Sequence, residues 1–184
     1  MNVYDFDKTI YDGDSTIDFY LYCVKKNPLI LRFFPRQLIA VLKYKLKIFD
    51  KTEMKEKFYI FFKSIQDIDC EIKKFWDKNG NKIKKWYLNN KKDNDVIISA
   101  SPEVLLSEAC KRIGVKYLIA SKVEKKTGKY NGLNCYGIEK VIRFHKQFPD
   151  TDIDEFYSDS YSDEPLAKIA RKSFLVSGNE IKKW

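Results

Sequence analysis

Short apolar runs alternate with amphipathic segments from residue 95 onward, and this alternation restricts the fold more than any other feature of the sequence. The apolar runs are bounded by polar loops, as is typical of buried parallel strands. They lie at 95–99, 116–121, 154–159 and 173–178. The intervening segments with helical spacing are 103–113, 137–148 and 164–172. Strands joined through helices predict an α/β core with a doubly wound, mostly parallel, Rossmann-like sheet.

One further strand is expected at residues 2–6, but a long helical segment separates it from the rest of the sheet. Residues 16 to 90 place apolar side chains at helical spacing, with breaks at Pro28 and Pro35. We therefore predict a core domain made of 1–15 and 91–184, with residues 16–90 inserted as an all-helical cap. Candidate helix caps are Ser15 or Thr16, Thr52, Asp69 and Ser101, the last followed by Pro102 at the first helical position.

Composition excludes several classes of protein. Hydrophobic residues make up 44% of the 184 residues, enough to form a core and too many for a disordered chain. The four cysteines and the single histidine fit no zinc pattern, and the cysteines are read as free thiols. No apolar signal segment precedes Asp5, and no uncharged stretch approaches the length of a membrane span. We expect a cytoplasmic protein.

The formal net charge of +9 admits an anionic substrate, an anionic membrane surface or a nucleic acid as partner. The lysines are scattered along the chain and form no long basic run, so the charge by itself requires no partner. In the inserted segment, basic residues interleave with a cluster of aromatic residues. Its aromatic residues fit a cap core, and contact of the cap with an anionic membrane stays open as an alternative. No nucleic-acid partner is expected.

Polar clusters stand where the predicted strands end. They are Asp5 to Thr9, Ser99 to Ser101 and Ser158 to Asp163, and Lys140 stands near the start of a helix. Ligands of open α/β sheets bind beyond the carboxyl ends of the strands. Solvated loops would not explain four such clusters at one edge of a sheet, so we expect them to form one site.

Phosphoryl transfer is the chemistry that this set of residues suits. Mg²⁺ prefers carboxylate, carbonyl and water oxygens, and Asp5 and Asp159 can supply carboxylates from neighbouring strand ends. A carboxylate can also attack phosphorus and form an aspartyl-phosphate, provided that a cation neutralises the phosphate. Lys140 can neutralise it from one side, and Ser99 can contribute a hydroxyl. Asp7, two residues after Asp5, can act as general acid and base.

The order and spacing of these clusters resemble the haloacid dehalogenase superfamily of phosphatases. DFDKT at 5–9 resembles the first motif, ISAS at 98–101 the second, Lys140 in GIEK the third and SDSYSD at 158–163 the fourth. The resemblance implies a fold with a helical cap and an Mg²⁺-dependent reaction. The roles that it implies are a nucleophile at Asp5, a general acid/base at Asp7, phosphate contacts at Ser99, Ala100 and Lys140, metal ligands at Asp5, Asp7 (through its carbonyl) and Asp159, and a supporting carboxylate at Asp163.

The position of the cap resembles subfamily IB, the phosphoserine-phosphatase-like branch. SASPE and YSDSYSD are most similar to a subgroup that includes type C phosphatidylglycerophosphate phosphatases. Ala100-Ser101 stands where phosphoserine phosphatases carry Gly-Gly, and Ser158-Asp159-Ser160 stands for Gly-Asp-Gly. Asp14 aligns with a glutamate that contacts the amino acid in those enzymes, which makes it a candidate substrate contact.

The sequence thus predicts a phosphomonoester hydrolase that acts through an aspartyl-phosphate on a small phosphorylated metabolite, such as an amino-acid or alcohol phosphate. A phosphatase of a phospholipid headgroup, such as phosphatidylglycerophosphate, is the alternative enzyme. The alternative of another class is a non-enzymatic module that binds anions or nucleic acid, although it leaves the acids at the strand ends unexplained.

Overall fold

A six-stranded sheet forms the centre of the protein, and the computed structural model describes residues 1–184. The strands are β1 (Asn2–Tyr4), β2 (Val96–Pro102), β3 (Tyr117–Ser121), β4 (Ile153–Ser158), β5 (Ala170–Ser177) and β6 (Glu180–Lys183). Their order is β3-β2-β1-β4-β5-β6, and only the β5–β6 pair is antiparallel. The predicted doubly wound, mostly parallel α/β core is confirmed.

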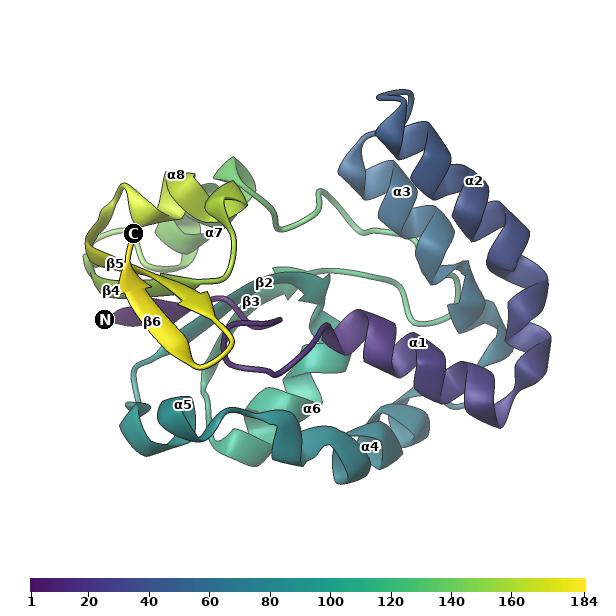
Figure 1. The fold of residues 1–184 in the computed structure, drawn as a ribbon, viewed down its shortest axis with the longest axis horizontal. Coiled ribbons are helices and arrows are strands. Elements are labelled where there is room, and N and C mark those ends of the chain that lie inside the picture. Colours follow the sequence, from purple (N-terminus) through teal and green to yellow (C-terminus); the bar gives the residue numbers. More distant parts are fainter.

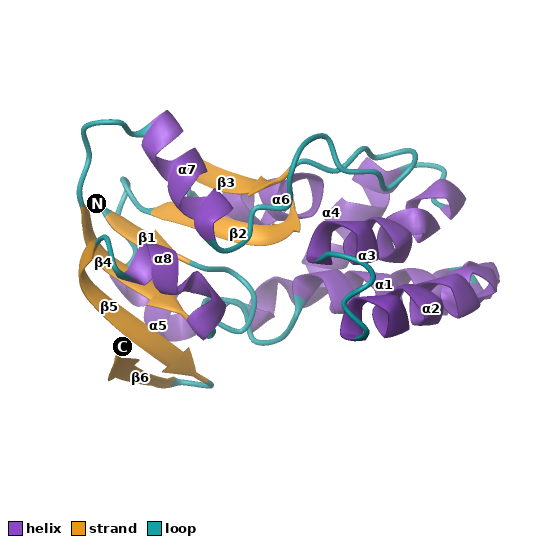
Figure 2. Cartoon of the chain, turned by 90° about the horizontal axis from the view of Figure 1, so that it is seen from above, coloured by secondary structure: helices purple, strands orange, loops and turns teal.

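Helices cover both faces of the sheet and extend beyond one end of it (Figure 1). The α-helices are α1 (Ser15–Lys26), α2 (Phe34–Lys45), α3 (Lys51–Phe58), α4 (Ile68–Asn79), α5 (Lys85–Asn90), α6 (Glu103–Ile113), α7 (Ile138–Gln147) and α8 (Glu164–Ala167). The 3₁₀ helices are η1 (Pro28–Phe33), η2 (Tyr59–Ser64), η3 (Gly80–Lys82) and η4 (Tyr161–Asp163). Figures 1 and 2 place α7 and α8 on one face of the sheet and α5 and α6 on the other. No helix combines the length and the apolar character needed to cross a bilayer.

Side chains that alternate along β1 build two separate cores. Val3 joins Phe156 and Phe144 in a cluster of ten buried residues beneath α7 and α8. Tyr4 points to the opposite face, where it stacks on Tyr157 at 4.9 Å and belongs to a cluster of 25 buried residues. This period of two is what a strand buried on both faces requires.

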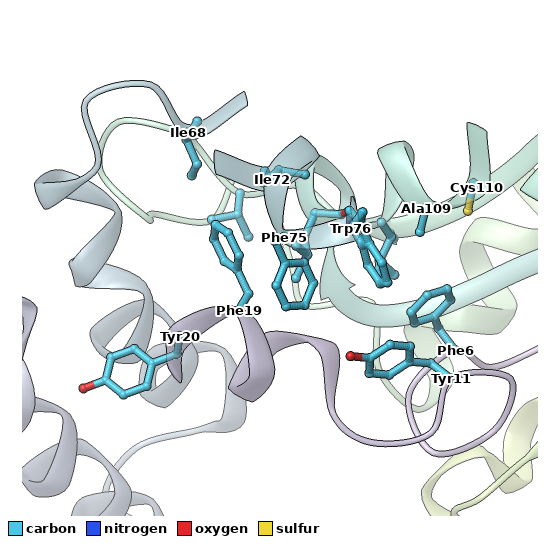
Figure 3. Close-up of a cluster of buried hydrophobic side chains, with 14 of the residues drawn as sticks. Phe6, Tyr11, Phe19, Tyr20, Ile68, Ile72, Phe75, Trp76, Ala109 and Cys110 are labelled. Carbon is cyan, nitrogen blue, oxygen red and sulfur yellow. The ribbon is translucent and has the colours of Figure 1, made fainter. Parts of the chain in front are cut away.

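The larger cluster runs without a break from the sheet into the helices of residues 15–90. Trp76 of α4 packs edge-on against Phe6 and Tyr11, and its indole N–H donates to the Leu105 carbonyl oxygen at 2.8 Å. Figure 3 shows this aromatic packing continuing through Phe75 to Phe19 of α1. The helices α1, α2 and α3 lie beyond the end of the sheet toward which β1 runs, whereas α4 and α5 return along its side (Figure 1). A domain boundary at residues 15 and 90 stays a prediction.

The residues predicted to cap three of the helices were wrong. The caps of α1, α3 and α4 are Asp14, Asp50 and Asp67, each of which accepts an N–H from the first turn. Aspartate caps displaced the expected Ser15 or Thr16, Thr52 and Asp69 because a carboxylate one or two residues earlier already satisfies those N–H groups. Asp50 also forms a capping box with Glu53.

The carboxyl-terminal third also differs in detail. The helix expected over 164–172 is only the four-residue α8, because the chain enters β5 at Ala170. Strand β6 was not predicted, since its side chains are all exposed and carry no apolar alternation. The hairpin expected around Thr127 and Gly128 has a single bridge between Val123 and Tyr130.

Candidate active site

The loop after β1 carries the first pair of acids and is tied to the sheet at several points. The backbone N–H of Asp5 donates to the Tyr157 carbonyl oxygen of β4 at 2.8 Å, which continues the strand pairing to the acid itself. Lys8 has a φ of 58°, unusual for a residue other than glycine, and its carbonyl oxygen accepts from Lys84 Nζ at 2.7 Å. A strained turn held from outside is typical of functional sites.

Lys140 lies between two carboxylates that come from different ends of the sequence. Its Nζ is 2.8 Å from Asp5 Oδ1 and 2.7 Å from Asp163 Oδ2, and all three side chains are buried. Asp163 Oδ2 also accepts from the Ser158 hydroxyl at 2.8 Å. Gly137, with a φ of 57°, precedes α7 and turns the chain so that Lys140 of its first turn faces the strand ends. The site thus holds a buried ion-pair triad with two acids for one ammonium.

This excess of acid sets the electrostatics of the triad. Burial raises the pKa of Asp5, since a single ammonium shared with Asp163 cannot fully offset the loss of solvation. Burial alone would lower the pKa of Lys140, but the two carboxylates raise it above its ordinary value, so the lysine stays charged. A further cation near these oxygens would relieve the imbalance.

Two hydrogen bonds fix the side chain of Asp7. The backbone N–H of Ser15 donates to Oδ1 at 2.6 Å, and the Ser101 hydroxyl donates to Oδ2. Burial, followed by the charge of Asp14, raises the pKa of Asp7 to about 6, against the lowering effect of these two donors. Such a carboxyl can change its protonation state near neutral pH, as a general acid/base requires.

Ser101 was expected to cap the helix that follows, and this prediction was wrong. Strand β2 continues through Pro102, helix α6 begins at Glu103, and Pro102 occupies the capping position without a side-chain bond. The Ser101 hydroxyl is buried and lies 3.1 Å from the Thr16 hydroxyl as well as against Asp7. It belongs to the site and not to the helix end.

All eight residues expected in the site line one pocket of about 430 Å³ between the strand ends and the helices α1 to α3. They are Asp5, Asp7, Asp14, Ser99, Ala100, Lys140, Asp159 and Asp163. The structure therefore brings together every predicted site residue. Their chemical roles stay predictions, because shared walls of a pocket do not identify what each group does.

The contacts of three of these residues refine the picture. Ser99 Oγ accepts the backbone N–H of Ser101 at 3.1 Å, at the end of β2. Asp14 Oδ1 accepts the N–H of Ile17 as the cap of α1, so this carboxylate has a structural task whatever else it contacts. Asp159 follows β4, and burial raises its pKa. No group of three or more His, Cys, Asp or Glu side chains is arranged to hold a metal by itself.

The sequence reasoning missed the wall of the pocket that α3 supplies. Lys51, Met54, Lys55 and Phe58 all line the pocket, and their spacing of three and four places them on one helix face. Lys55 Nζ donates to the Ala100 carbonyl oxygen at 2.7 Å, and burial, with the nearby charge of Lys51, lowers the pKa of Lys55 to about 8. Two lysines four residues apart beside apolar positions were the available signal, but the sequence did not show which face of the helix meets the pocket.

Comparison with known proteins places this site in a family. The protein-family model for haloacid dehalogenase-like hydrolases matches residues 3–168, which include all four motifs. The chain belongs to this family. A search of curated proteins found no match.

Solved structures of several haloacid dehalogenase-like and other proteins share the fold at low identity. A protein with unknown function from Bordetella pertussis Tohama I has 17% identity and a TM-score of 0.77, covering 94% of this chain and 87% of its own. A phosphoserine phosphohydrolase-like protein from Francisella tularensis has 16% identity and a TM-score of 0.61, with coverage of 98% and 90%. A phospho-aspartyl intermediate analogue of phosphoserine phosphatase has 13% identity and a TM-score of 0.53, with coverage of 93% and 83%. The fold of this haloacid dehalogenase-like hydrolase is thus of the phosphoserine-phosphatase-like type.

Proposed function

We propose that this protein is an Mg²⁺-dependent phosphomonoester hydrolase that uses Asp5 as its nucleophile. The main support for this proposal is that one pocket is lined by four residues from separate strand ends and one helix: Asp5, Asp7, Lys140 and Asp159. A nucleophilic carboxylate beside a buried ammonium suits attack on an anion such as a phosphate monoester. The substrate that we propose is a small phosphorylated metabolite, such as an amino-acid or alcohol phosphate.

The residues present fit a magnesium ion. Apart from Lys8 and Ala100, the residues that line the pocket from the strand ends carry side-chain oxygens, and Asp163 Oδ1 is a buried oxygen that accepts no hydrogen bond from the protein. Mg²⁺ keeps several water ligands and needs few protein carboxylates, so the lack of a three-acid cluster does not argue against it. Asp5, Asp159 and the carbonyl of Asp7 would hold the ion, and Asp163 Oδ1 would accept from one of its waters. When bound, the ion would neutralise charge on the phosphate oxygens.

The chain's own residues then have distinct tasks in the proposed cycle. Lys140 and Ser99 orient the phosphate while Asp5 attacks phosphorus in line with the leaving oxygen. Protonated Asp7 donates its proton to that oxygen as the alcohol leaves. Asp7, now a carboxylate, takes a proton from the water that attacks the aspartyl-phosphate, which returns Asp5 and releases inorganic phosphate. Ser101 and the Ser15 N–H keep the Asp7 carboxyl aimed during both steps.

The decisive test is the hydrolysis of para-nitrophenyl phosphate with Mg²⁺. Asp5→Asn removes the nucleophile and is expected to abolish turnover, while Asp93→Asn, an exposed loop residue, leaves the rate unchanged. EDTA is expected to stop the wild type and Mg²⁺ to restore it. Retained turnover in Asp5→Asn would exclude the nucleophile, and metal-independent turnover would exclude the metal site.

A phospholipid headgroup is the second candidate substrate, and the apolar wall of the pocket favours it. Val41 of α2 and Met54 and Phe58 of α3 line the pocket. A hydrophobic leaving group would bury these side chains, whereas an amino-acid phosphate would leave them without a partner. A panel of phosphorylated amino acids, alcohol phosphates and lipid phosphates in detergent, assayed with Mg²⁺, separates the two by kcat/KM. No turnover of any member, together with salt-dependent binding to DNA, would instead support a non-enzymatic module.

A further inference from the structure

The outward side of α2 is apolar where a helix at a protein surface is normally polar. Phe34, Leu38, Leu42 and Leu46 follow one another at intervals of four residues and are 48–70% exposed. Ile39 of α2 and Leu31 of the preceding η1 are also exposed, by 51% and 48%. We call these six residues the outer face of α2. Half of the large hydrophobic residues that the whole chain exposes lie between Leu29 and Ile48.

The opposite side of the same helix is the one that packs on the protein. Gln37 and Ala40 are buried, and the Gln37 side chain accepts from the Tyr20 hydroxyl and donates to the Phe58 carbonyl oxygen. The helix is thus held in place with its apolar stripe directed away from the chain, at the outer edge of the molecule in Figure 1. An apolar patch of this kind on a monomer marks an interaction surface.

The charges around the outer face of α2 indicate the kind of partner that covers it. Residues 19–49 contain no Asp or Glu but seven Lys and Arg residues, and only Lys26 pairs with an acid, Glu71. At 3.6 residues per turn, Arg36 and Lys43 lie near one edge of this stripe and Lys45 near the other, and Arg32 lies in η1 just before α2. A partner must therefore be anionic as well as apolar.

We propose that the outer face of α2 docks on an anionic lipid bilayer. A bilayer interface accepts leucine and phenylalanine side chains below the headgroups while its anionic lipids pair with lysine and arginine at headgroup level. If a second copy of this chain docked there instead, the seven basic residues of one copy would face the seven of the other and repel them. A nucleic acid would pair with the basic residues but leave the aliphatic stripe exposed.

The docking surface and the proposed active site share one helix. Val41 lines the pocket from the packed side of α2, one residue away from Leu42 on the outer face. The pocket would therefore lie within one helix diameter of the bilayer surface, about 10–12 Å. The binding itself does not rest on the proposed reaction, because the assay below contains no substrate.

Flotation with vesicles tests the proposal on the full chain. The wild type is expected to float with vesicles of phosphatidylcholine mixed with phosphatidylglycerol, and about tenfold less with phosphatidylcholine alone. Leu38→Glu with Leu42→Glu, and separately Arg36→Glu with Lys45→Glu, are each expected to lower binding about tenfold. Matched controls on other surfaces are Leu133→Glu with Ile142→Glu, and Lys111→Glu with Lys116→Glu, which are all exposed and should bind like the wild type.

Several outcomes would overturn the proposal. These are the absence of binding to anionic vesicles, an equal loss in the control variants, and a loss in the charge variant alone. The wild type could instead self-associate without binding vesicles, and Leu38→Glu with Leu42→Glu could remove that self-association. This result would assign the face to a second copy.

If circular dichroism shows that the variant with both glutamates does not fold, Leu42→Trp gives an independent measurement. After subtraction of the wild-type spectrum, to which three tryptophans contribute, its emission should shift to the blue with anionic vesicles, and an unchanged difference spectrum would contradict insertion.

Discussion

At the scale of single residues, the Asp7 carboxyl depends on donors that its own motif does not contain. The Ser101 hydroxyl reaches Asp7 from a strand end some ninety residues later, and the Ser15 N–H reaches it from the start of α1. Asp7 is therefore positioned by two elements that are independent of the loop on which it stands. A general acid/base needs such support because a small rotation of the carboxyl would break its contact with the reacting oxygen.

Removing the Ser101 hydroxyl should slow the reaction without weakening substrate binding. A hydrogen bond to a charged acceptor contributes about 1.5–3 kcal/mol, so Ser101→Ala should lower kcat about tenfold or more and leave KM nearly unchanged. Ser107→Ala, which removes an exposed hydroxyl of α6, is the matched control. A rise in KM with unchanged kcat would show that Ser101 contacts the substrate instead of positioning Asp7.

Asp7 also affects stability, in the opposite sense to most aspartates. Its pKa is raised from 3.8 to about 6 in the folded protein, so the folded chain binds more protons than the unfolded chain between these values. The stability that depends on this proton is present below about pH 4 and is lost as the pH rises through about 6. In EDTA at pH 7.5, Asp7→Asn should raise the free energy of unfolding by about 2 kcal/mol.

Urea unfolding at two pH values measures this effect. The increase in the free energy of unfolding that Asp7→Asn causes should be smaller at pH 4.5 than at pH 7.5. At the lower pH the wild-type carboxyl is protonated and no longer carries a buried charge. Asp93→Asn, at an exposed site, should change stability at neither pH. Equal or lower stability of Asp7→Asn at pH 7.5 would mean that the carboxylate is well solvated in the folded protein.

At the scale of elements, α3 brings positive charge to a site otherwise built from strand ends. Lys55 is half-buried and contacts the Ala100 carbonyl oxygen, and its pKa is lowered to about 8. The side chain is therefore charged at neutral pH and loses its charge above about pH 8. An anionic substrate in the pocket should bind more weakly once that charge is gone.

The pH dependence of KM tests the contribution of Lys55. The wild-type KM for para-nitrophenyl phosphate should rise above about pH 8, and Lys55→Arg, which keeps its charge, should remove that rise. Lys55→Met should raise KM about tenfold at pH 7. Lys57→Met, exposed on the same helix, serves as control. A KM that is flat up to pH 9 in the wild type would contradict a role for the Lys55 charge.

The strand ends of the site could be predicted from the sequence, whereas the helical wall could not. Asp5, Asp159 and Ser99 each follow a short apolar run, and the rule for open sheets brings such positions to one edge. Lys55 meets Ala100 only through the path of α1 to α3, which helical spacing does not determine. The caps Asp14 and Asp67 show the same limit on a smaller scale, because several polar residues in a row could each have begun the helix.

At the scale of the whole molecule, the continuous aromatic cluster joins the inserted helices to the sheet. Trp76 contacts Phe6 beside the site and donates to the Leu105 carbonyl oxygen of α6. Because 25 buried residues share this cluster, helices and sheet should unfold together. Trp76→Phe should lower the free energy of unfolding by about 2–3 kcal/mol through loss of packing and of one hydrogen bond.

This cooperativity can be tested by asking whether two probes report the same unfolding transition. Urea curves followed by far-ultraviolet circular dichroism and by activity should superimpose for the wild type and for Trp76→Phe, with the variant shifted to lower urea. Trp184→Phe, at the edge of the sheet, should shift the curve less. A two-step loss of ellipticity, with activity lost in the first step, would show that the inserted helices unfold separately.

The central place of β1 in the sheet has a bearing on how the protein is made. Val3 pairs with Val96 on one side and with Phe156 on the other, so β1 has no neighbouring strand until roughly ninety further residues have been translated. Its second neighbour follows about sixty residues after the first, and the lysine that balances Asp5 lies at residue 140. Asp5 and Asp7 of the nascent chain therefore stay exposed to solvent, and the candidate active site assembles late in folding.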